Sequence, residues 1–243
     1  MDPTTATAPG QTEAINPVTG ETLGYSPLFA PEDLEKTLVA ACGAQHQWAQ
    51  LAVKERARCL LPIGDYLVDH ADEIAETISR DNGKVRVDAM GTEVLPASLA
   101  LHYYCRKAPG FLRDRRLSPG NILFANKVCK RLRVPHGVVG IVSPWNYPFG
   151  LPFHEVITAL LAGNAVLLKA ASETQMVGRI FKACIEAGEL PKGLFTYINL
   201  PGRVAGDAFL DGGVDKLSFT GSTKVGKYLM AKAAQTLTPI SLE

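Results

Sequence analysis

From Gly137 to Glu243 the chain alternates short apolar runs with segments of helical periodicity, and this alternation restricts the possible folds more than any other feature. The run Val138–Val142 is too short for a helix and is rich in β-branched residues, which is typical of a strand buried on both faces. The predicted strands are Val138–Val142, Ala165–Lys169, Leu194–Asn199, Lys216–Phe219 and Pro239–Glu243, and the helices between them are Phe153–Leu161, Thr174–Ala187, Val204–Leu210 and Ser222–Ala234. Repeated βα units with short connections predict an α/β fold built on a doubly wound parallel sheet.

The first half of the chain predicts a hairpin followed by helices. Residues 1–14 lack the basic segment and apolar core of a signal peptide, and we expect them to form a disordered tail. A turn signal at Asn16–Gly20 predicts a hairpin over Ile15–Ala30. Helices are expected from Pro31, over Lys54–Val68, over Ala71–Arg80 and from Val87 to about Lys107, the last with a kink at Pro96. We therefore assign residues 15–113 to a hairpin and helices, and residues 137–243 to a Rossmann-like core.

Residues 114–136 form a basic stretch between these two parts. Charged and apolar side chains alternate over Ile122–Val134, which indicates a half-exposed antiparallel strand. A two-stranded arm that projects from the body and pairs with another subunit would explain this pattern. An ordinary solvated edge strand would explain it equally well.

Composition and charge exclude several classes of protein. A net charge of +1 gives no electrostatic reason to expect binding to nucleic acid or to an anionic membrane, and no apolar stretch is long enough to span a bilayer. The cysteine count is five, an odd number, without a CxxC pair. This argues against a disulfide frame or a zinc site and for a reducing compartment, so we expect a cytoplasmic protein without a metal.

Polar residues follow the predicted strands at their carboxyl ends, where such sheets bind ligands. Gly221 allows a sharp turn and Ser222 can cap the next helix, whose free N–H groups would bind a phosphate, although many such turns only cap a helix. Lys169 emerges from an apolar run and needs a partner. The residues delivered to this edge include Ser143, Trp145, Asn146, Lys169, Ser172, Gly202, Thr220, Gly221, Ser222 and Glu243. No GxGxxG follows any strand, so the standard dinucleotide fingerprint is absent.

Two of these residues are candidates for catalysis. Asn146 could donate an amide N–H to a developing oxyanion, and Glu243 could be a general base or simply a surface carboxylate. The residues alone thus predict a nucleotide-binding α/β domain whose chemistry stays undecided.

An ordered set of motifs resembles the aldehyde dehydrogenase superfamily. It comprises Pro144-Trp145-Asn146, Ala162-Gly163-Asn164, Lys169, Pro201-Gly202, Phe219-Thr220-Gly221-Ser222-Thr223 with Gly226, and Ser241-Leu242-Glu243. The resemblance implies oxidation of an aldehyde to a carboxylic acid with NAD or NADP, through a cysteine thiolate and a thioester. It also implies a homo-oligomer.

The resemblance assigns a role to each motif. Asn146 would be the oxyanion donor and Glu243 the general base that activates water. The cofactor-binding residues would be Ser143, Trp145 and Ser222, the last two at the pyrophosphate; Lys169 and Ser172 at the adenosine ribose; Gly202 at the adenine; and Thr220 and Gly221 at the nicotinamide side.

The sequence departs from the family pattern at three points. The nucleophilic cysteine is expected after the Glu243 motif, and none of the five cysteines has its context, so we expect a truncated chain that is inactive alone. The alternative is a non-catalytic nucleotide-binding or interaction module. Ser172 replaces a glutamate that excludes a 2′-phosphate, so NADP should be tolerated. Glu155 replaces a lysine associated with proton relay, which implies either a different relay or a different substrate funnel.

Overall fold

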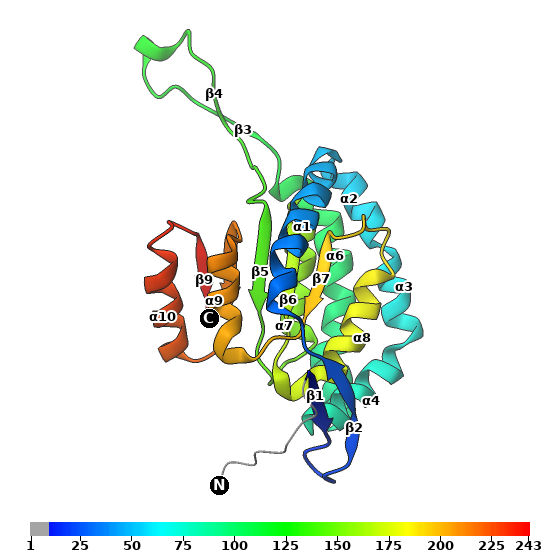
Figure 1. The fold of residues 1–243 in the computed structure, drawn as a ribbon. Coiled ribbons are helices and arrows are strands. Elements are labelled where there is room, and N and C mark those ends of the chain that lie inside the picture. The colour runs from blue at the N-terminus through cyan, green and yellow to red at the C-terminus, as the bar shows by residue number, and fades with distance from the viewer. Residues whose placement is uncertain (1–9) are drawn as a thin grey trace.

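A five-stranded parallel sheet forms the centre of the protein, in a computed structural model that describes residues 10–243 (Figure 1). The strands are β5 (Val138–Val142), β6 (Ala165–Lys169), β7 (Phe195–Ile198), β8 (Lys216–Phe219) and β9 (Ile240–Leu242). They lie in the order β7-β6-β5-β8-β9, and every neighbouring pair is parallel. The predicted α/β fold with a doubly wound sheet is therefore confirmed.

Helices cover both faces of this sheet. The helices α7 (Gly150–Leu161) and α8 (Gln175–Glu186) pack on one face, whereas α1 (Leu34–Gln50) and α9 (Gly202–Gly212) pack on the other. The helix α10 (Thr223–Ala233) lies beside α9 and β9. Because of this double coverage, all residues of β5 and β6 are buried, as their apolar runs predict.

The strand order places β5 at the point where the winding reverses. Strand β5 pairs with β6 on one side and with β8 on the other, so the connections that leave its two neighbours run in opposite directions. In open α/β sheets a crevice forms at this position, beyond the carboxyl ends of the strands.

The hairpin near the start of the chain corrects one expectation. Strands β1 (Gln11–Ile15) and β2 (Thr22–Pro27) pair antiparallel, so residues 11–14 belong to a strand and not to a disordered tail. The remainder of the predicted tail, residues 1–9, lies outside the described residues. The difference arises because β2 pairs with these residues. Ala14 is buried, and the turn after β1 begins at Asn16, whose Oδ1 atom accepts a hydrogen bond from the Val18 N–H.

The N-terminal helices follow the prediction with two differences. The predicted helix Lys54–Val68 is two helices, α2 (Val53–Leu60) and α3 (Pro62–Asp69), because the proline starts a new helix. The predicted helix from Val87 consists of α5 (Arg86–Ala89), a π-helical segment η2 (Met90–Val94) and α6 (Leu95–Phe111). Pro96 lies in the first turn of α6 and so does not kink it. Outside the arm, the structure also has η1 (Pro31–Asp33), α4 (Ala71–Asn82) and η4 (Ser172–Thr174).

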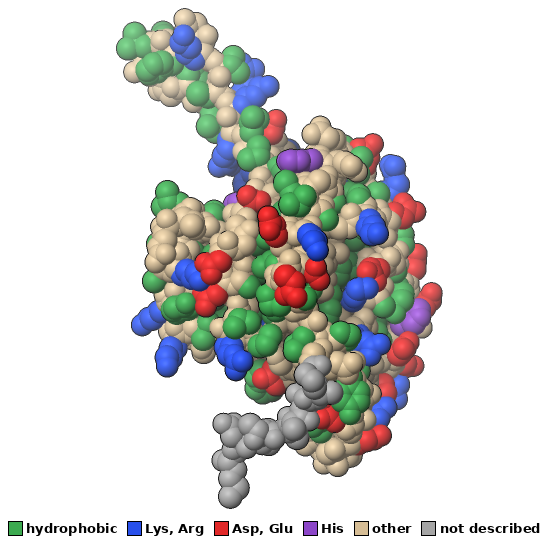
Figure 2. All heavy atoms as spheres, in the orientation of Figure 1, with side chains coloured by type: hydrophobic (Ala, Val, Ile, Leu, Met, Phe, Trp, Pro, Cys, Tyr) green, Lys and Arg blue, Asp and Glu red, His purple; other side chains and the backbone are tan. Residues whose placement is uncertain are grey.

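A two-stranded arm projects from the body (Figure 1). It consists of β3 (Arg115–Leu117) and β4 (Cys129–Arg131), antiparallel, with a 3₁₀ helix η3 (Ile122–Phe124) at its tip. The strand predicted over Ile122–Val134 is therefore too long, since its first three residues form the 3₁₀ turn. The side chains of the arm are exposed and are mostly cationic or hydrophobic (Figure 2).

Within residues 10–243 no helix combines the length and the apolar character needed to cross a membrane.

Candidate cofactor and active-site cleft

A cleft of about 670 Å³ lies at the carboxyl ends of β5, β6 and β8, where the winding of the sheet reverses. Its lining includes all ten residues singled out from the sequence: Ser143, Trp145, Asn146, Lys169, Ser172, Gly202, Thr220, Gly221, Ser222 and Glu243. These residues come from five separate connections and strand ends, so the fold brings together side chains that are up to a hundred positions apart.

The loop after β5 contributes three side chains to the cleft, those of Ser143, Trp145 and Asn146. The Asn146 Oδ1 atom accepts a hydrogen bond of 3.1 Å from the Tyr147 N–H. No partner within the described part of the chain is recorded for the Asn146 Nδ2 atom, so its N–H groups can donate to a ligand. Trp145 is 56% exposed and lines the cleft. The Ser143 hydroxyl is buried and has no protein partner among residues 10–243.

Lys169 ends β6 with an ammonium group that lacks a partner. The residue is only 4% exposed, and among the described residues its Nζ atom has neither an ion pair nor a hydrogen bond within the usual distances. Burial lowers the pKa of this ammonium below its usual value, and the nearby Glu173 carboxylate opposes that shift. A Cβ atom added to Gly202 would lie 3.6 Å from Lys169 Nζ, so the ammonium lies beside the N-terminus of α9.

The turn after β8 forms the opposite wall. A Cβ atom on Gly221 would lie 2.6 Å from the Phe219 ring, so only glycine fits this close approach. The Ser222 Oγ atom caps α10 by accepting a hydrogen bond of 3.4 Å from the Val225 N–H. The N–H groups of the first turn that the cap leaves unpaired face outward from the helix start, which favours an anion there.

Glu243 continues the ladder between β8 and β9. Its N–H donates to the Phe219 carbonyl at 3.1 Å, and its own carbonyl accepts from the Gly221 N–H at 3.0 Å. The carboxyl group is exposed and lines the cleft. The position of Glu243 is thus fixed by its backbone.

Glu155 lies on α7 beside β8, and it lines a depression separate from the cleft together with Ser218. The Ser218 hydroxyl donates to Glu155 Oε1, whereas Glu155 Oε2 is buried without a protein partner in the described chain. Burial raises the pKa of the Glu155 carboxyl; the Ser218 hydrogen bond opposes this shift and the Glu243 charge adds to it.

None of the five cysteines lines the cleft. Cys105 and Cys184 are buried, and burial raises the pKa of both thiols. No group of three or more His, Cys, Asp or Glu side chains within residues 10–243 is arranged to hold a metal ion.

Three residues near the cleft have contacts that the sequence analysis missed. Asn82, Lys84 and Glu93 bind the backbone of the loop after β5 and of the following helix start. The only local signal in the sequence was a carboxylate, Glu93, within a stretch of helical periodicity. The structure buries this side chain completely.

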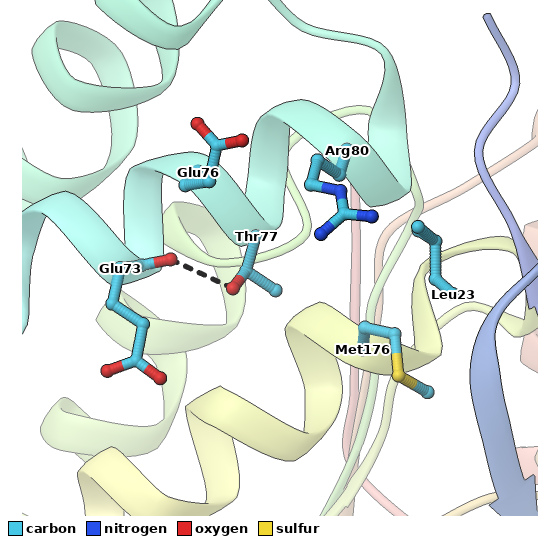
Figure 3. A pocket seen from close by; sticks show the side chains of 6 residues that line it. All are labelled: Leu23, Glu73, Glu76, Thr77, Arg80 and Met176. Carbon is cyan, nitrogen blue, oxygen red and sulfur yellow. Dashed lines mark hydrogen bonds between the residues drawn. The ribbon is translucent and has the colours of Figure 1, made fainter. Parts of the chain in front are cut away.

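A second depression, of about 340 Å³, lies between α4, β2 and α8 (Figure 3). Its residues are Leu23, Glu73, Glu76, Thr77, Arg80 and Met176. The Thr77 hydroxyl donates to the Glu73 carbonyl within the helix, and Arg80 pairs with Glu21 at 3.4 Å. Its two side-chain donors are thus used within the helix and in a surface ion pair, so the depression lacks the convergent free donors of the cleft.

Comparison with known proteins identifies the family. The model of the Aldehyde dehydrogenase family matches residues 4–243. The chain is 36% identical over 230 residues to the 4,4'-diapolycopene aldehyde oxidase of Methylomonas sp, covering 95% of this chain and 43% of that protein.

Two solved structures have the same fold. One is the NAD+ complex of an aldehyde dehydrogenase from Bacillus cereus, with a TM-score of 0.87 and 28% identity over 96% of this chain and 47% of that one. The other is an NADP-dependent enzyme of E. coli, with a TM-score of 0.88 and 28% identity over 96% of this chain and 48% of that one. The chain therefore spans about half the length of the relatives it matches. With the family model matching nearly all of its residues, the chain belongs to the aldehyde dehydrogenase family.

Proposed function

We propose that residues 1–243 form the cofactor-binding portion of an enzyme that oxidises an aldehyde to a carboxylic acid with NAD+ or NADP+. The observation that carries this proposal is the cleft at the carboxyl ends of β5, β6 and β8. There Asn146 and Glu243 lie together with the eight residues that the family resemblance assigns to the cofactor.

The polar groups of the cleft fit a dinucleotide. Lys169 is 4% exposed and lines the cleft, and its ammonium has no hydrogen-bond partner in the described chain, so a ribose hydroxyl or a 2′-phosphate could bind it there. The start of α10 offers N–H groups to a pyrophosphate. We assign the pyrophosphate to Trp145, Ser143 and Ser222, the adenine to Gly202, the ribose to Lys169 and Ser172, and the nicotinamide side to Thr220 and Gly221.

The catalytic roles follow from the free groups at the other end of the cleft. The Asn146 Nδ2 atom donates to the aldehyde oxygen as it becomes an oxyanion, since the Oδ1 atom is already held by the Tyr147 N–H. Glu243 takes the proton of the water that hydrolyses the thioester. The bound nicotinamide supplies the hydride acceptor. Because no cysteine lines the cleft, the attacking thiolate comes from a residue outside this span.

Either nicotinamide cofactor is compatible with the ribose site. Ser172 offers a hydroxyl near Lys169 in place of a carboxylate, so no fixed negative charge at that position repels a 2′-phosphate. Glu173 also lines the cleft and limits the preference for NADP.

The exposed arm supports assembly into a homo-oligomer. Its strands β3 and β4 carry exposed cationic side chains, and its tip carries the exposed hydrophobic residues Ile122, Leu123 and Phe124, all of which another subunit would cover. Deletion of residues 118–128, with the arm closed by a short turn, should convert the oligomer into monomers in light scattering. An unchanged mass would contradict this assignment. We place the protein in the cytoplasm, because its five cysteines are all free.

The test of the proposed function begins with binding. The protein has two tryptophans, and Trp48 is buried whereas Trp145 lines the cleft. NAD+ and NADP+ should therefore quench the fluorescence saturably, and the Trp145→Phe variant should lose this signal. The full gene product that contains these residues should then form NAD(P)H from an aldehyde, and Asn146→Ala should slow it by about 10²-fold or more.

The absence of a thiolate from the cleft favours one alternative, a nucleotide-binding module without catalysis. Residues 1–243 alone should bind the cofactor and form no NAD(P)H from aldehydes. Robust aldehyde-dependent NAD(P)H formation by that span would refute the assignment of the thiolate to another region. Cofactor binding without activity in the full gene product would favour the module.

A further inference from the structure

The loop Ser143–Phe149 has few hydrogen bonds of its own. Pro144 and Pro148 have no N–H group to donate, and Trp145, Asn146 and Tyr147 are exposed. A loop that presents an indole and a carboxamide to a ligand therefore needs support from another part of the fold.

That support comes from the end of α4. The Asn82 Nδ2 atom donates to the Trp145 carbonyl at 2.7 Å, and the Lys84 Nζ atom donates to the Asn146 carbonyl at 3.1 Å. Gly83 lies between these two donors with a φ of +80° and turns the chain out of the helix. The two neighbouring carbonyls of Trp145 and Asn146 are thus bound by the last residue of α4 and by the residue that follows its C-terminal glycine.

Glu93 binds both Lys84 and the backbone at the end of the loop. Its side chain is completely buried, and one oxygen accepts from Lys84 Nζ at 2.5 Å. Its other oxygen accepts from the Phe149 and Gly150 N–H groups at 2.8 and 3.0 Å. The carboxylate therefore connects Lys84 with the start of α7, and the π-helical segment that carries Glu93 directs it there.

Lys84 also contacts the aromatic ring of Tyr147. Its Nζ atom lies 3.9 Å from the centroid of Tyr147, within the range of a cation–π interaction. The side chain is only 14% exposed, so its position is defined by Glu93, Tyr147 and the Asn146 carbonyl together.

We propose that Asn82, Lys84 and Glu93 form a loop clamp that positions the Asn146 amide and the Trp145 indole for the reaction. The inference rests on the proposed function of Asn146 as the oxyanion donor. The Lys84 ammonium binds the carbonyl of the residue whose amide must meet the aldehyde oxygen. A shift of that carbonyl moves the amide, and a misplacement of about 1 Å can cost on the order of 10²-fold in rate.

The test uses the full gene product with Lys84→Met and Asn82→Asp. Lys84→Met keeps the apolar stem and removes the donor, whereas Asn82→Asp keeps the shape and sets a carboxylate against the Trp145 carbonyl. Lys84→Met should lower kcat by about tenfold or more, with the KM for the cofactor changed by less than about threefold. Asn82→Asp should lower kcat by about tenfold as well and should also raise that KM, because it displaces Trp145 at the pyrophosphate. Lys84→Arg should recover most of the rate, because it restores the charge beside Glu93. Lys182→Met is the control, since Lys182 forms a surface pair with Glu186 away from the cleft.

A second readout reports on the clamp without any activity. Trp48 is 1% exposed, so collisional quenching by acrylamide reports mainly on Trp145. Both variants should increase the quenching constant of the cofactor-free protein at a temperature where each is fully folded, and Lys182→Met should not. Lys84→Met should also lower the melting temperature, because it leaves the buried Glu93 carboxylate without its cation. An unchanged quenching constant overturns the clamp whatever the rate does, and so does increased quenching with kcat within about twofold of wild type. If the wild-type protein oxidises no aldehyde, the proposed function fails, and quenching alone then decides whether the clamp orders the loop.

Discussion

Replacing Lys169 by methionine separates what the buried ammonium costs the fold from what it contributes to cofactor binding. The residue ends β6, is 4% exposed, and has no hydrogen bond or ion pair recorded within the described chain. Methionine fills nearly the same length without a charge. The substitution should therefore stabilise the cofactor-free protein and weaken its complex with NAD(P).

The sign of the stability change follows from the pKa. Burial lowers the pKa of the Lys169 ammonium in the folded state, so folding disfavours the charged form. Below the folded pKa the charge costs stability, and the wild-type protein regains it as the pH rises through the folded pKa toward the ordinary value of 10.5. At neutral pH we expect Lys169→Met to raise the free energy of unfolding by about 1 kcal/mol, or ~2–4 °C in Tm.

Binding should change in the opposite direction. A hydrogen bond from a charged donor contributes about 1.5–3 kcal/mol, so the Kd for NAD(P)+ should rise by about 10- to 150-fold. Urea unfolding measures the first effect and titration calorimetry the second. Lys182→Met is the matched control: it removes an exposed lysine and should change stability by less than about 1 kcal/mol and binding not at all. A destabilised cofactor-free variant would show that Lys169 stabilises the fold, and an unchanged Kd would show that it does not bind the cofactor. Either result would refute the reasoning.

Three further predictions follow from single side chains. Ser172→Glu should shift the ratio of NAD+ to NADP+ affinity toward NAD+ by about tenfold or more in calorimetry, since a carboxylate there repels a 2′-phosphate; equal weakening of both cofactors would contradict this. Gly178→Ala should lower the free energy of urea unfolding by about 1–3 kcal/mol, because the added Cβ atom would lie 2.2 Å from the Tyr197 Oη atom. At Gly43 in α1 an added Cβ atom meets nothing within 4 Å, so Gly43→Ala should raise the free energy of unfolding by about 0.5–1 kcal/mol. Glu155→Gln should match the wild-type stability near pH ~4 and exceed it near pH ~7. Burial raises the pKa of the Glu155 carboxyl in the folded state, so the wild-type protein loses stability as the pH rises through this folded-state pKa. A constant difference across that pH range would exclude the titration of this carboxyl.

The sheet was predictable because its signals are local. A strand buried on both faces is a continuous run of apolar residues, so Val138–Val142 and Ala165–Lys169 are found with the predicted bounds. Their stop signals then located the strand ends, and in a parallel sheet these ends must meet at one edge. The candidate site could be collected from the sequence for that reason.

Other features escaped the sequence because they depend on contacts between distant residues. Residues 11–14 carry no strong strand pattern, and they form a strand only because β2 pairs with them. The apolar period of α5 and α6 conceals the π-helical segment between them, since one additional residue per turn does not interrupt a helical pattern.

For the central sheet, the sequence by itself determined which strands and helices form and which side chains stand at their ends, because hydrophobic period, proline and glycine act over a few residues. Only the tertiary structure decided the order β7-β6-β5-β8-β9 and the cleft that this order creates. It also decided that Asn82 and Lys84, more than 60 positions away, bind the carbonyls of Trp145 and Asn146. The physical reason is that a backbone carbonyl is the same in every residue, so its partner is set by packing and leaves no trace in the local sequence.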